Sequence, residues 1–333
     1  RPEDAPVHVT QGLEESNIDE KYSEPPMIQV IPSACNACPE NEYCVTDRCM
    51  GCVAHPCQVV CPRGAISTVN GKSVIDQSKC IRCGKCIHSC PFGAIASKTF
   101  IVPVIEALKA GKHIYAMAAP ATEGQFGADI TMASWKKAMK EMGFTDFYDV
   151  GLGGDMTAAY EAEEWAEAYK EGNKKVTSCC PAFVNMVRLH YPELAECVST
   201  TVSPMCAISR LIKAKDPEAV TVFIGPCIAK KSEVEDQKIE GNADYVLTYS
   251  EIRAMMKAKG VELQPCANDD QTASTFGKRF ANSGGVTAAV LESLKESNDE
   301  IAATVCKANG AAECKKALLL LKAARLPEDF IEG

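Results

Sequence analysis

The crowding of cysteines between residues 35 and 97 constrains this chain more than any other feature. Eleven of its 19 cysteines lie in this segment. The segment also repeats itself, because Cys61–Ile66 reads CPRGAI and Cys90–Ile95 reads CPFGAI. A chain of 333 residues can bury a sizeable core and needs no disulfides to replace one. Closely spaced thiols in such a chain indicate metal ligands, and the repeat predicts a duplicated small metal domain.

Two cysteine runs within the segment follow one ligand logic. The later run is the bacterial ferredoxin pattern CxxCxxCxxxCP, and the earlier run has the same form with two extra residues. In such pairs three closely spaced thiolates bind one cubane and the fourth reaches the other cluster. Tetrahedral zinc is the alternative for CxxC pairs, but the cysteine-proline endings and the repeated Gly-Ala-Ile belong to the ferredoxin pattern. We therefore expect two [4Fe-4S] clusters, one bound by Cys49, Cys52, Cys57 and Cys90 and the other by Cys61, Cys80, Cys83 and Cys86.

Three further cysteines precede or interrupt these runs without completing a third. Cys35, Cys38 and Cys44 supply one thiolate too few for a cubane. They either form a further metal site with a ligand from elsewhere or are structural thiols. His55 and His88 lie inside the cysteine runs, where thiolates suffice, so we expect neither histidine to be a ligand.

Charge and hydrophobic pattern argue against two classes of function. The formal net charge is -9 at pH 7, which disfavours a nucleic-acid partner because a basic face supplies most of that affinity. No apolar run approaches the length of about 18 residues that spans a membrane, and no signal-peptide pattern opens the chain. We therefore expect a cytoplasmic protein. The ends at Arg1 and Gly333 have no terminal signals, which suggests a trimmed or processed segment.

The cysteines become sparse after residue 97, where strand-like and helix-like patterns begin to alternate. Residues 1–34 are polar and punctuated by proline, which predicts an arm or linker. Residues 35–97 are expected to form an α+β two-cluster ferredoxin domain, and residues 98–333 an α/β domain. The expected strands of the latter are 113–119, 146–150, 220–225 and 244–248, and the expected helices are 131–142, 156–171, 204–214, 249–259, 286–296 and 311–324.

Two short segments of the α/β domain carry candidate ligands. Thr177–Phe183 reads TSCCPAF at a strand-to-helix turn, where adjacent cysteines diverge so that one suits a buried ligand and the other a thiol facing a cavity. Gly225–Glu233 reads GPCIAKKSE and begins at the end of a predicted strand. Ligands collect at that edge of open α/β sheets. Taken separately, either segment could hold a core cysteine near surface charges.

Together, and downstream of a two-cluster ferredoxin segment, these motifs resemble the first two signature motifs of [FeFe]-hydrogenases. The resemblance spans residues 35–333 and makes the α/β domain an iron-hydrogenase catalytic domain. It implies an H-cluster, in which a [4Fe-4S] cubane is joined through a cysteine sulfur to a two-iron unit with CO, CN and a bridging dithiolate. By the resemblance, Cys180 and Cys227 are cubane ligands, Lys230 hydrogen-bonds a cyanide, and Cys179 passes protons to the dithiolate amine.

The family's proton route continues through a serine and two glutamates, which correspond by resemblance to Ser203, Glu161 and Glu164. A thiol with a pKa near neutrality can shuttle protons, and an ammonium in a dry pocket stabilises an anionic cyanide. Glu161 and Glu164 lie three residues apart and share a face of a predicted helix. The alternative for both is a solvated acidic face, because Glu163 and Glu167 surround them.

The chain departs from the family pattern at three places. Gly225 stands where the second motif commonly has methionine, and Phe183 where the first often has tryptophan, which suggests a divergent subgroup with an altered pocket. The third motif, a cysteine pair in a glycine-rich stretch, is absent. Residues 330–333 look like its lead-in, so we expect a catalytic domain truncated at its C-terminus. No other pair replaces it, and the cysteines read as buried or free thiols are Cys197, Cys206, Cys266, Cys306 and Cys314.

The resemblance implies a hydrogenase that interconverts dihydrogen with protons and electrons and relays electrons through its ferredoxin clusters. A ferredoxin or similar carrier and hydrogenase maturation proteins would be its partners. Three other functions stay open: an iron-sulfur assembly factor of the same fold, a sensory hydrogenase-like protein, and a plain electron carrier. The paired thiols of Cys179 and Cys180 favour the enzyme over the assembly factor, because a structural cubane needs only one of them.

Overall fold

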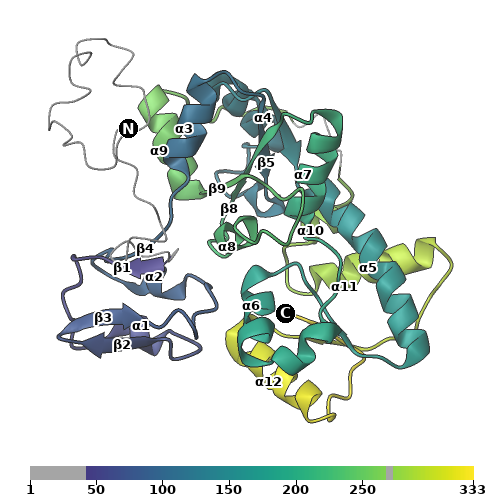
Figure 1. The fold of residues 1–333 in the computed structure, drawn as a ribbon. Coiled ribbons are helices and arrows are strands. Elements are labelled where there is room, and N and C mark those ends of the chain that lie inside the picture. The colour runs from purple at the N-terminus through teal and green to yellow at the C-terminus, as the bar shows by residue number, and fades with distance from the viewer. Residues whose placement is uncertain (1–42, 268–272) are drawn as a thin grey trace, which may run out of the picture. The chain divides into compact units, whose positions relative to one another are not determined.

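The structure of this chain is a computed structural model that describes residues 43–267 and 273–333 (Figure 1). The arm predicted over residues 1–34, together with Cys35 and Cys38, lies outside the described residues. None of the helices in the described part is long and apolar enough to cross a membrane.

Residues 43–97 form an α+β unit of two antiparallel strand pairs and two short helices. β1 pairs with β4 and β2 with β3, while the two helices pack against each other. In chain order the elements are β1 (Tyr43–Val45), α1 (Pro56–Val59), β2 (Ile66–Val69), β3 (Lys72–Ile75), α2 (Lys85–Ser89) and β4 (Ile95–Ser97).

The sequence repeat forms the core of this α+β unit. Ile66 and Ile95, the last residues of the two repeats, are both buried and share one apolar cluster with Cys57. Ala65 and Ala94, which precede them, are buried as well. The repeated Gly-Ala-Ile therefore gives the two halves the same buried positions.

A four-stranded parallel sheet forms the centre of the second part of the chain. Its spatial order is β6-β5-β8-β9, and every neighbouring pair is parallel. The sheet has helices on both sides, which is the α/β architecture that the sequence predicts. All four predicted strands are present: β5 (Ile114–Ala118), β6 (Asp146–Asp149), β8 (Val220–Gly225) and β9 (Tyr245–Thr248).

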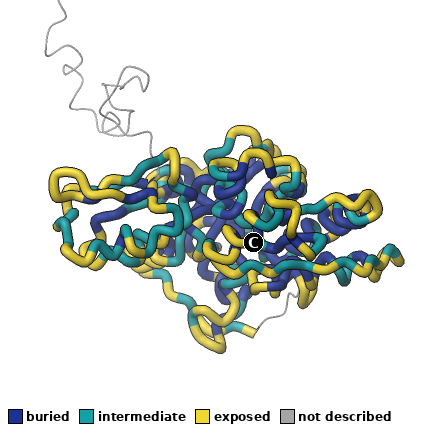
Figure 2. The backbone as a smooth tube through the Cα atoms, turned by 90° about the horizontal axis from the view of Figure 1, so that it is seen from below, coloured by how far each residue is buried: buried dark blue, intermediate teal, exposed yellow. Residues whose placement is uncertain are grey.

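The principal helices around this sheet are α3 (Ile101–Lys109), α4 (Met132–Met142), α5 (Gly151–Glu171), α7 (Pro204–Lys215) and α9 (Tyr249–Lys259). α3 and α9 lie on one side of the sheet and α7 on the other (Figure 1). Thr131 and Thr248 begin α4 and α9 with capping boxes, which satisfy free N–H groups of the first turn. Figure 2 shows the buried segments of this part at its centre and the exposed segments around them.

A second parallel sheet of three short strands lies beside α5. Its strands β7 (Lys175–Val176), β10 (Val305–Lys307) and β11 (Phe330–Glu332) pair in the order β10-β11-β7. Phe330 is buried and stacks on Trp165 of α5, with ring centroids 4.2 Å apart. The sequence does not predict these strands, because two or three residues are too few to show a period. Residues 330–332, read from sequence as a motif lead-in, form the central strand of this sheet.

The remaining helices are α6 (Pro181–His190), α8 (Lys230–Val234), α10 (Thr275–Arg279), α11 (Gly285–Glu296) and α12 (Gly310–Lys322). α5 packs against α7, α10 and α11, while α6 packs against α8 and α12. The six helices predicted from sequence are all present, although α5 begins at Gly151 rather than at residue 156.

A buried lysine on α8 joins the α/β part of the chain to the ferredoxin-like unit. Lys231 is 1% exposed, and its Nζ lies 2.8 Å from Glu251 Oε1 and donates to the carbonyl of Lys98 at 2.7 Å. The hydroxyl of Tyr43 donates to the carbonyl of Ile228 at 3.0 Å. These bonds fasten the segment after β8 to β1 and to the residue after β4.

Replacing Lys231 by methionine should lower the free energy of unfolding by about 3 kcal/mol, because Glu251 then keeps a charge in a mostly buried place without its partner. Chemical denaturation measures this change. The matched control is Lys140→Met, which removes an exposed lysine 3.6 Å from Asp146 and should change stability by less than about 0.5 kcal/mol. Equal effects of the two substitutions would contradict this role of Lys231.

Candidate functional site

Four cysteines of the ferredoxin-like unit come together as the sequence pattern predicts. Cys86 is partly buried, and burial is the main cause that raises the pKa of its thiol to about 12. The charges of Cys80, Cys83 and Cys61 raise it further, so these sulfurs are neighbours. Four thiolates so close together repel one another unless bound cations compensate their charges. Four such thiolates are the donor set of an iron-sulfur cluster.

Two cysteines of the other predicted cluster, Cys49 and Cys57, contact Ser73 of β3. The N–H of Ser73 donates to Cys49 Sγ at 3.4 Å, and its hydroxyl lies 3.4 Å from Cys57 Sγ. The first of these bonds is the main cause that lowers the pKa of Cys49. Cys57 and Cys90 share the apolar cluster at the centre of the unit.

The repeat also fixes one sulfur in each half. The N–H of Ala65 donates to Cys61 Sγ at 3.2 Å, and the N–H of Ala94 donates to Cys90 Sγ at 3.3 Å. These two bonds are equivalent in the repeat, and bonds of this kind stabilise a thiolate.

Among the described residues, no three His, Cys, Asp or Glu side chains could hold a single metal ion. Cys44 lies on β1 opposite Ala96, and the third metal site stays a prediction.

A cavity of about 360 Å³ opens at the carboxyl ends of β5, β6 and β8. Cys179, Cys180, Cys227 and Lys230 all line it. Burial is the main cause that raises the pKa of Cys180, and the charge of Cys227 is the next. The three predicted sulfurs therefore share one cavity, whose size is that of a small-molecule or cofactor site.

The adjacent cysteines diverge for a local reason. Cys180 caps the N-terminus of α6, where Pro181 supplies the first helical residue and the carbonyl of Cys180 accepts from two helical N–H groups. Cys180 packs on the apolar cluster that contains Phe183, whereas Cys179 packs on the cluster that contains Trp165. The two neighbouring thiols thus contact different parts of the protein core.

Burial raises the pKa of Cys179 well above that of an ordinary thiol, and the charges of Glu161 and Cys180 add to this effect. The Cys179 thiol therefore holds its proton more firmly than an ordinary cysteine.

Lys230 and Lys307 are the two lysines that line the cavity, and Lys230 is the one beside the cysteine motifs. Its Nζ lies 2.5 Å from Glu233 Oε2 and donates to the carbonyl of Cys179 at 3.1 Å. Burial by itself lowers the pKa of this lysine, but the charge and hydrogen bond of Glu233 outweigh it and raise the pKa. Glu233 has no predicted role in its motif, although a spacing of three residues on a helix places it beside Lys230.

Comparison with known proteins agrees with this geometry. Residues 112–333 match the family described as iron only hydrogenase large subunit, C-terminal domain, and residues 73–96 match the 4Fe-4S binding domain. This chain belongs to the iron-only hydrogenase large-subunit family.

Individual relatives are distant. Iron hydrogenase 1 of Clostridium pasteurianum is 30% identical over 293 residues, which cover 67% of this chain and 51% of that protein. The NADP-reducing hydrogenase subunit HndD of Solidesulfovibrio fructosivorans is 25% identical over 75% of this chain and 50% of its own length. The chain thus spans about half the length of these relatives. The apo [FeFe]-hydrogenase HydA1 from Chlamydomonas reinhardtii has the same fold, with a TM-score of 0.55 and 20% identity over 69% of this chain and 80% of that one.

The residues predicted for the proton route differ in burial and in hydrogen-bond partners. Glu161 on α5 is fully buried, and both of its carboxyl oxygens lack a well-oriented hydrogen bond within the described residues. Burial raises its pKa to about 8, and the neighbouring Glu164 adds to this. Glu161 is therefore a buried, neutral acid at pH 7. The solvated acidic face is wrong for Glu161 and describes Glu163 and Glu167, which are exposed.

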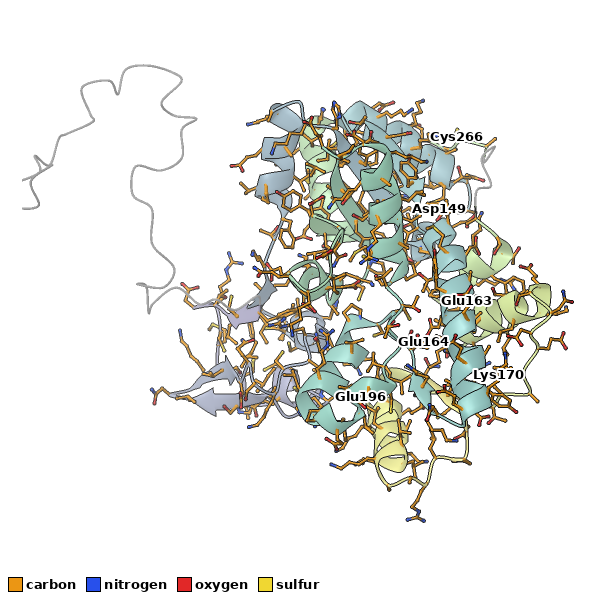
Figure 3. All side chains as sticks on the ribbon, turned by 45° about the vertical axis from the view of Figure 1, so that its right-hand side comes forward. Asp149, Glu163, Glu164, Lys170, Glu196 and Cys266 are labelled. Carbon is orange, nitrogen blue, oxygen red and sulfur yellow. The ribbon has the colours of Figure 1, made fainter. Side chains whose placement is uncertain are left out.

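Glu164, labelled on α5 in Figure 3, has several partners. Its carboxylate lies 2.6 Å from Lys175 Nζ and accepts from Ser199 Oγ at 2.6 Å. Ser203, the serine expected on this route, donates instead to Glu233. The serine that bonds one of the two glutamates is therefore Ser199, and only the tertiary structure separates it from Ser203.

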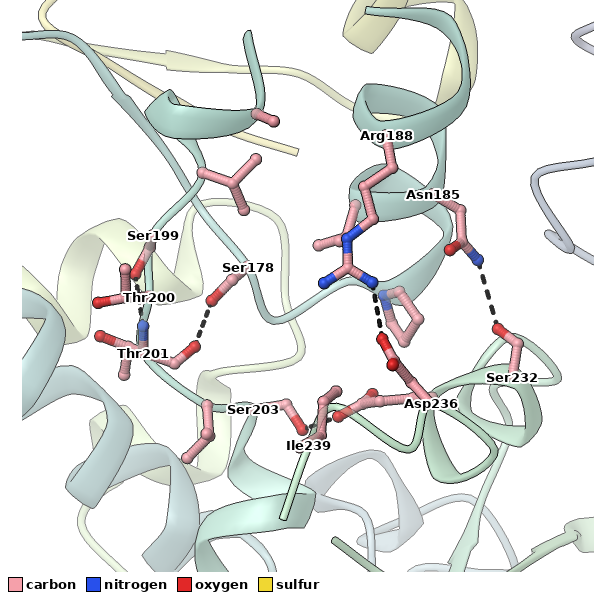
Figure 4. Close-up of a pocket in the computed structure, with 16 residues that line it drawn as sticks. Ser178, Asn185, Arg188, Ser199, Thr200, Thr201, Ser203, Ser232, Asp236 and Ile239 are labelled. Atoms are coloured by element: carbon pink, nitrogen blue, oxygen red, sulfur yellow. Dashed lines mark hydrogen bonds and ion pairs between the residues drawn. The ribbon is translucent and has the colours of Figure 1, made fainter. Parts of the chain in front are cut away.

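A second cavity of about 320 Å³ is lined by Ser199 and Ser203 (Figure 4). Ten of its 16 lining residues are polar or charged, so we call it the polar cavity. Its wall includes the hydroxyl-rich loop 199–203 and the carboxylate of Glu233. Arg188 and Asp236 pair across 2.7 Å on another part of the wall. Ser203 and Glu233 thus lie between this polar cavity and Lys230 of the cysteine-lined cavity.

The remaining predicted thiols differ in burial. Cys206 and Cys314 are buried, while Cys197, Cys266 and Cys306 are partly exposed. Burial is the main cause that raises the pKa of Cys314 to about 11, and the charge of Cys180 is the next. Cys314 therefore lies near Cys180 but behind the cavity wall, in the apolar cluster of Ile331.

The departure from the family pattern at Gly225 has a steric cause. A Cβ atom at Gly225 would lie 2.7 Å from Cε1 of Phe223 and 3.0 Å from Cβ of Ala119. Phe223 is buried and lines the cysteine-lined cavity. Its ring thus fills space on the same face of β8 as residue 225, because side chains two residues apart on a strand share a face.

Gly225→Met should therefore destabilise the protein by about 1–3 kcal/mol through overpacking. Phe223→Val should also destabilise it, through loss of buried apolar volume. The double variant should be at least about 1 kcal/mol more stable than the sum of the two losses predicts, since each change relieves the other. Denaturation of all four proteins measures this coupling, and additive losses would contradict it.

The raised pKa of Glu161 predicts a pH-dependent stability. The folded protein holds this proton up to about pH 8, whereas the unfolded chain releases it near 4.5. Rising pH across this window therefore removes stability, by up to about 1.4 kcal/mol per pH unit. Glu161→Gln lacks this loss, so its stability relative to the parent should rise by more than about 2 kcal/mol from pH 5 to pH 8.

The matched control for this measurement is Glu163→Gln, an exposed neighbour on the same helix. Its effect should stay within about 0.5 kcal/mol at both pH values. Denaturation at pH 5 and pH 8, in protein without added iron, separates the two variants. A pH-independent effect of Glu161→Gln would show that this carboxyl is not the buried neutral acid described above.

Proposed function

We propose that this chain is the catalytic and electron-relay part of a hydrogenase, which interconverts dihydrogen with protons and electrons. The observation that carries the proposal is the convergence of Cys179, Cys180, Cys227 and Lys230 on one cavity at the carboxyl end of a parallel sheet. Membership of the family supports it. In this proposal Cys180 and Cys227 bind a cubane that is joined to the two-iron unit of an H-cluster.

The donors present suit part of such a group, because the cysteine pair of the third motif is absent from this sequence. Two cysteine sulfurs suit iron, and an ammonium suits an anionic ligand such as cyanide. When bound, the H-cluster supplies the chemistry that forms and cleaves the H–H bond. The protein positions the group, keeps water out and moves protons. Most of the cavity lining is apolar, with Phe223, Met205 and Val286 among the side chains.

Protons would move along buried groups that start at Cys179. The buried thiol is protonated, and its neighbour Glu161 is a neutral acid that can both donate and accept. Glu164 lies next in line, and its hydrogen bond to Ser199 leads to the polar cavity. We propose Ser199 for the serine of this route in place of Ser203.

Electrons would enter through the ferredoxin-like unit. Cys83 and Ile81 pack in the same apolar cluster as Cys180, so the cluster predicted to include Cys83 would lie toward the cavity. The backbone of Gly84 also approaches Ile228, the residue after Cys227, closely enough that a Cβ would lie 3.0 Å from its side chain. An external electron carrier would then exchange electrons at the other predicted cluster, the one bound by Cys49, Cys52, Cys57 and Cys90. Hydrogenase maturation proteins would be needed to load the two-iron unit.

An iron-sulfur assembly factor of the same fold is the competing function. Such a protein has no use for a proton route, whereas Cys179 and Glu161 are buried at an electrostatic cost beside the cavity. These two groups favour the hydrogenase.

Infrared spectroscopy of the matured protein tests the proposal, together with a hydrogen-evolution assay. Bands of iron-bound CO and CN are expected. Cys179→Ala should keep these bands and lower hydrogen evolution by about 100-fold or more, because it removes the proton donor. Cys206→Ala, a buried thiol outside the cavity lining, is the control and should keep both. A loaded protein without CO and CN bands and without hydrogen evolution would favour the assembly factor.

A further inference from the structure

Three side chains form a continuous hydrogen-bonded chain between the two cavities. Lys230 lines the cysteine-lined cavity, Ser203 lines the polar cavity, and Glu233 bonds to both of them. Figure 4 shows the bond of Ser203 and the loop that carries it. The three residues come from two elements, because Lys230 and Glu233 lie on α8 and Ser203 begins α7.

The carboxylate of Glu233 has its two oxygens engaged separately. Oε2 lies 2.5 Å from Lys230 Nζ, and Oε1 accepts from the hydroxyl of Ser203. The backbone of Glu233 is fixed as well, since its carbonyl accepts from Asn242 Nδ2 at 2.8 Å. Its side chain is only 8% exposed. A buried carboxylate held at both oxygens has one orientation, and that orientation determines where the ammonium points.

The hydroxyl of Ser203 is fixed in the same way. Its oxygen accepts from the N–H of Cys206 at 3.4 Å as the N-cap of α7, which leaves its hydrogen for Glu233. A hydroxyl that caps a helix and donates to a carboxylate is a rigid support.

Lys230 needs such a support. Its side chain is 10% exposed, and an unpaired ammonium in that position would lose its proton or turn toward water. The groups that face it besides Glu233 are the carbonyl of Cys179, which accepts a hydrogen bond at 3.1 Å, and the thiols of Cys179 and Cys227, the second of which is a proposed ligand. Neither thiol holds the ammonium in one direction once a metal binds Cys227.

We propose that Glu233 and Ser203 are positioning residues that hold the Lys230 ammonium charged and directed at the anionic ligand of the bound iron group. This inference rests on the proposed function. It gives Ser203 a supporting role in place of the proton-carrying role that the family resemblance suggested. Glu233 and Ser203 act through Lys230 and touch no reacting atom.

The adjacent lysine supplies a matched control. Lys231 is also buried and also pairs with a glutamate, Glu251, at 2.8 Å. It also donates to the carbonyl of Lys98 and the hydroxyl of Ser97, and it does not line either of the two cavities. Loss of a buried ion pair is thus common to both lysines, but only Lys230 reaches the cysteine-lined cavity.

Infrared spectra of the matured Glu233→Gln, Ser203→Ala and Lys231→Met variants test the proposal. Glu233→Gln should move a cyanide stretching band to lower wavenumber, because the hydrogen bond to the cyanide weakens, and should lower hydrogen turnover about 10- to 100-fold. Ser203→Ala should shift the same band in the same direction by less. Glu233→Asp, which keeps the charge, should recover part of the shift. Lys231→Met should leave the cyanide bands in place even if it destabilises the protein.

Two results would overturn the proposal. Cyanide bands unmoved in Glu233→Gln, in protein with full CO and CN intensity, would show that Glu233 does not orient Lys230. Unmoved bands in Ser203→Ala, together with slower turnover and a larger solvent isotope effect, would return Ser203 to the proton route. If the parent protein itself shows no CO and CN bands, the proposed function fails instead.

A measurement without the iron group tests the same interaction separately. Amine-reactive labelling of Lys230 in the unloaded full chain, followed by mass spectrometry across pH 7 to 10, reports how firmly the lysine holds its proton. The label should react faster in Glu233→Gln at each pH, since the neutral amine is the reactive form. Equal labelling rates of the parent and Glu233→Gln would contradict the proposal.

Discussion

The cysteine-lined cavity depends on the pairing of two very short strands that are distant in sequence. Lys175–Val176 is held by Phe330–Ile331, and the pairing continues as the N–H of Thr177 donates to the carbonyl of Ile331 at 3.0 Å. Gly333 then donates to the hydroxyl of Thr177 at 3.2 Å. Cys179 and Cys180 follow at once, so their position opposite Cys227 is set by contacts across about 150 residues. Such contacts cost more chain entropy than local ones, which explains why large aromatic rings, Phe330 and Trp165, stabilise this junction.

Electrostatics around the cavity follows from the burial of its titratable groups. A neutral thiol, a neutral carboxylic acid and an ammonium paired with a carboxylate lie next to one another at Cys179, Glu161 and Lys230. In a medium of low polarity each of these states avoids an isolated charge. Glu161 is the exception in hydrogen bonding, because it is buried without a well-placed partner among the described residues. A buried carboxyl group without a hydrogen-bond partner destabilises the fold, and such groups are typical of functional sites.

Much of the fold could be predicted from sequence because its signals are local. The continuous apolar run of β8 and the capping residues Thr131 and Thr248 are properties of neighbouring residues, and the cysteine spacing of the ferredoxin-like unit is another. The second sheet could not be predicted, since strands such as Lys175–Val176 contain too few residues to show a pattern and depend on partners elsewhere. Residues 330–333 resemble in sequence the lead-in to a motif, but residues 330–332 form a strand that pairs with the segment before Cys179.

The candidate site shows the same division. The cysteine positions at the turn after β7 and at the end of β8 could be predicted, because ligand-bearing turns have recognisable sequence. The partners of polar side chains could not: Ser199 and Ser203 are four residues apart in one loop, yet one bonds Glu164 and the other Glu233. The sequence likewise does not predict that the ring of Phe223 fills the space beside Gly225, because this depends on the tertiary structure.

Anomalous X-ray scattering at the iron absorption edge, from crystals of the anaerobically loaded protein, tests the central claim most directly. The account predicts iron in contact with both Cys180 Sγ and Cys227 Sγ, in addition to iron at the ferredoxin-type cysteines. Iron at the ferredoxin-type cysteines with none at Cys180 and Cys227 would contradict it.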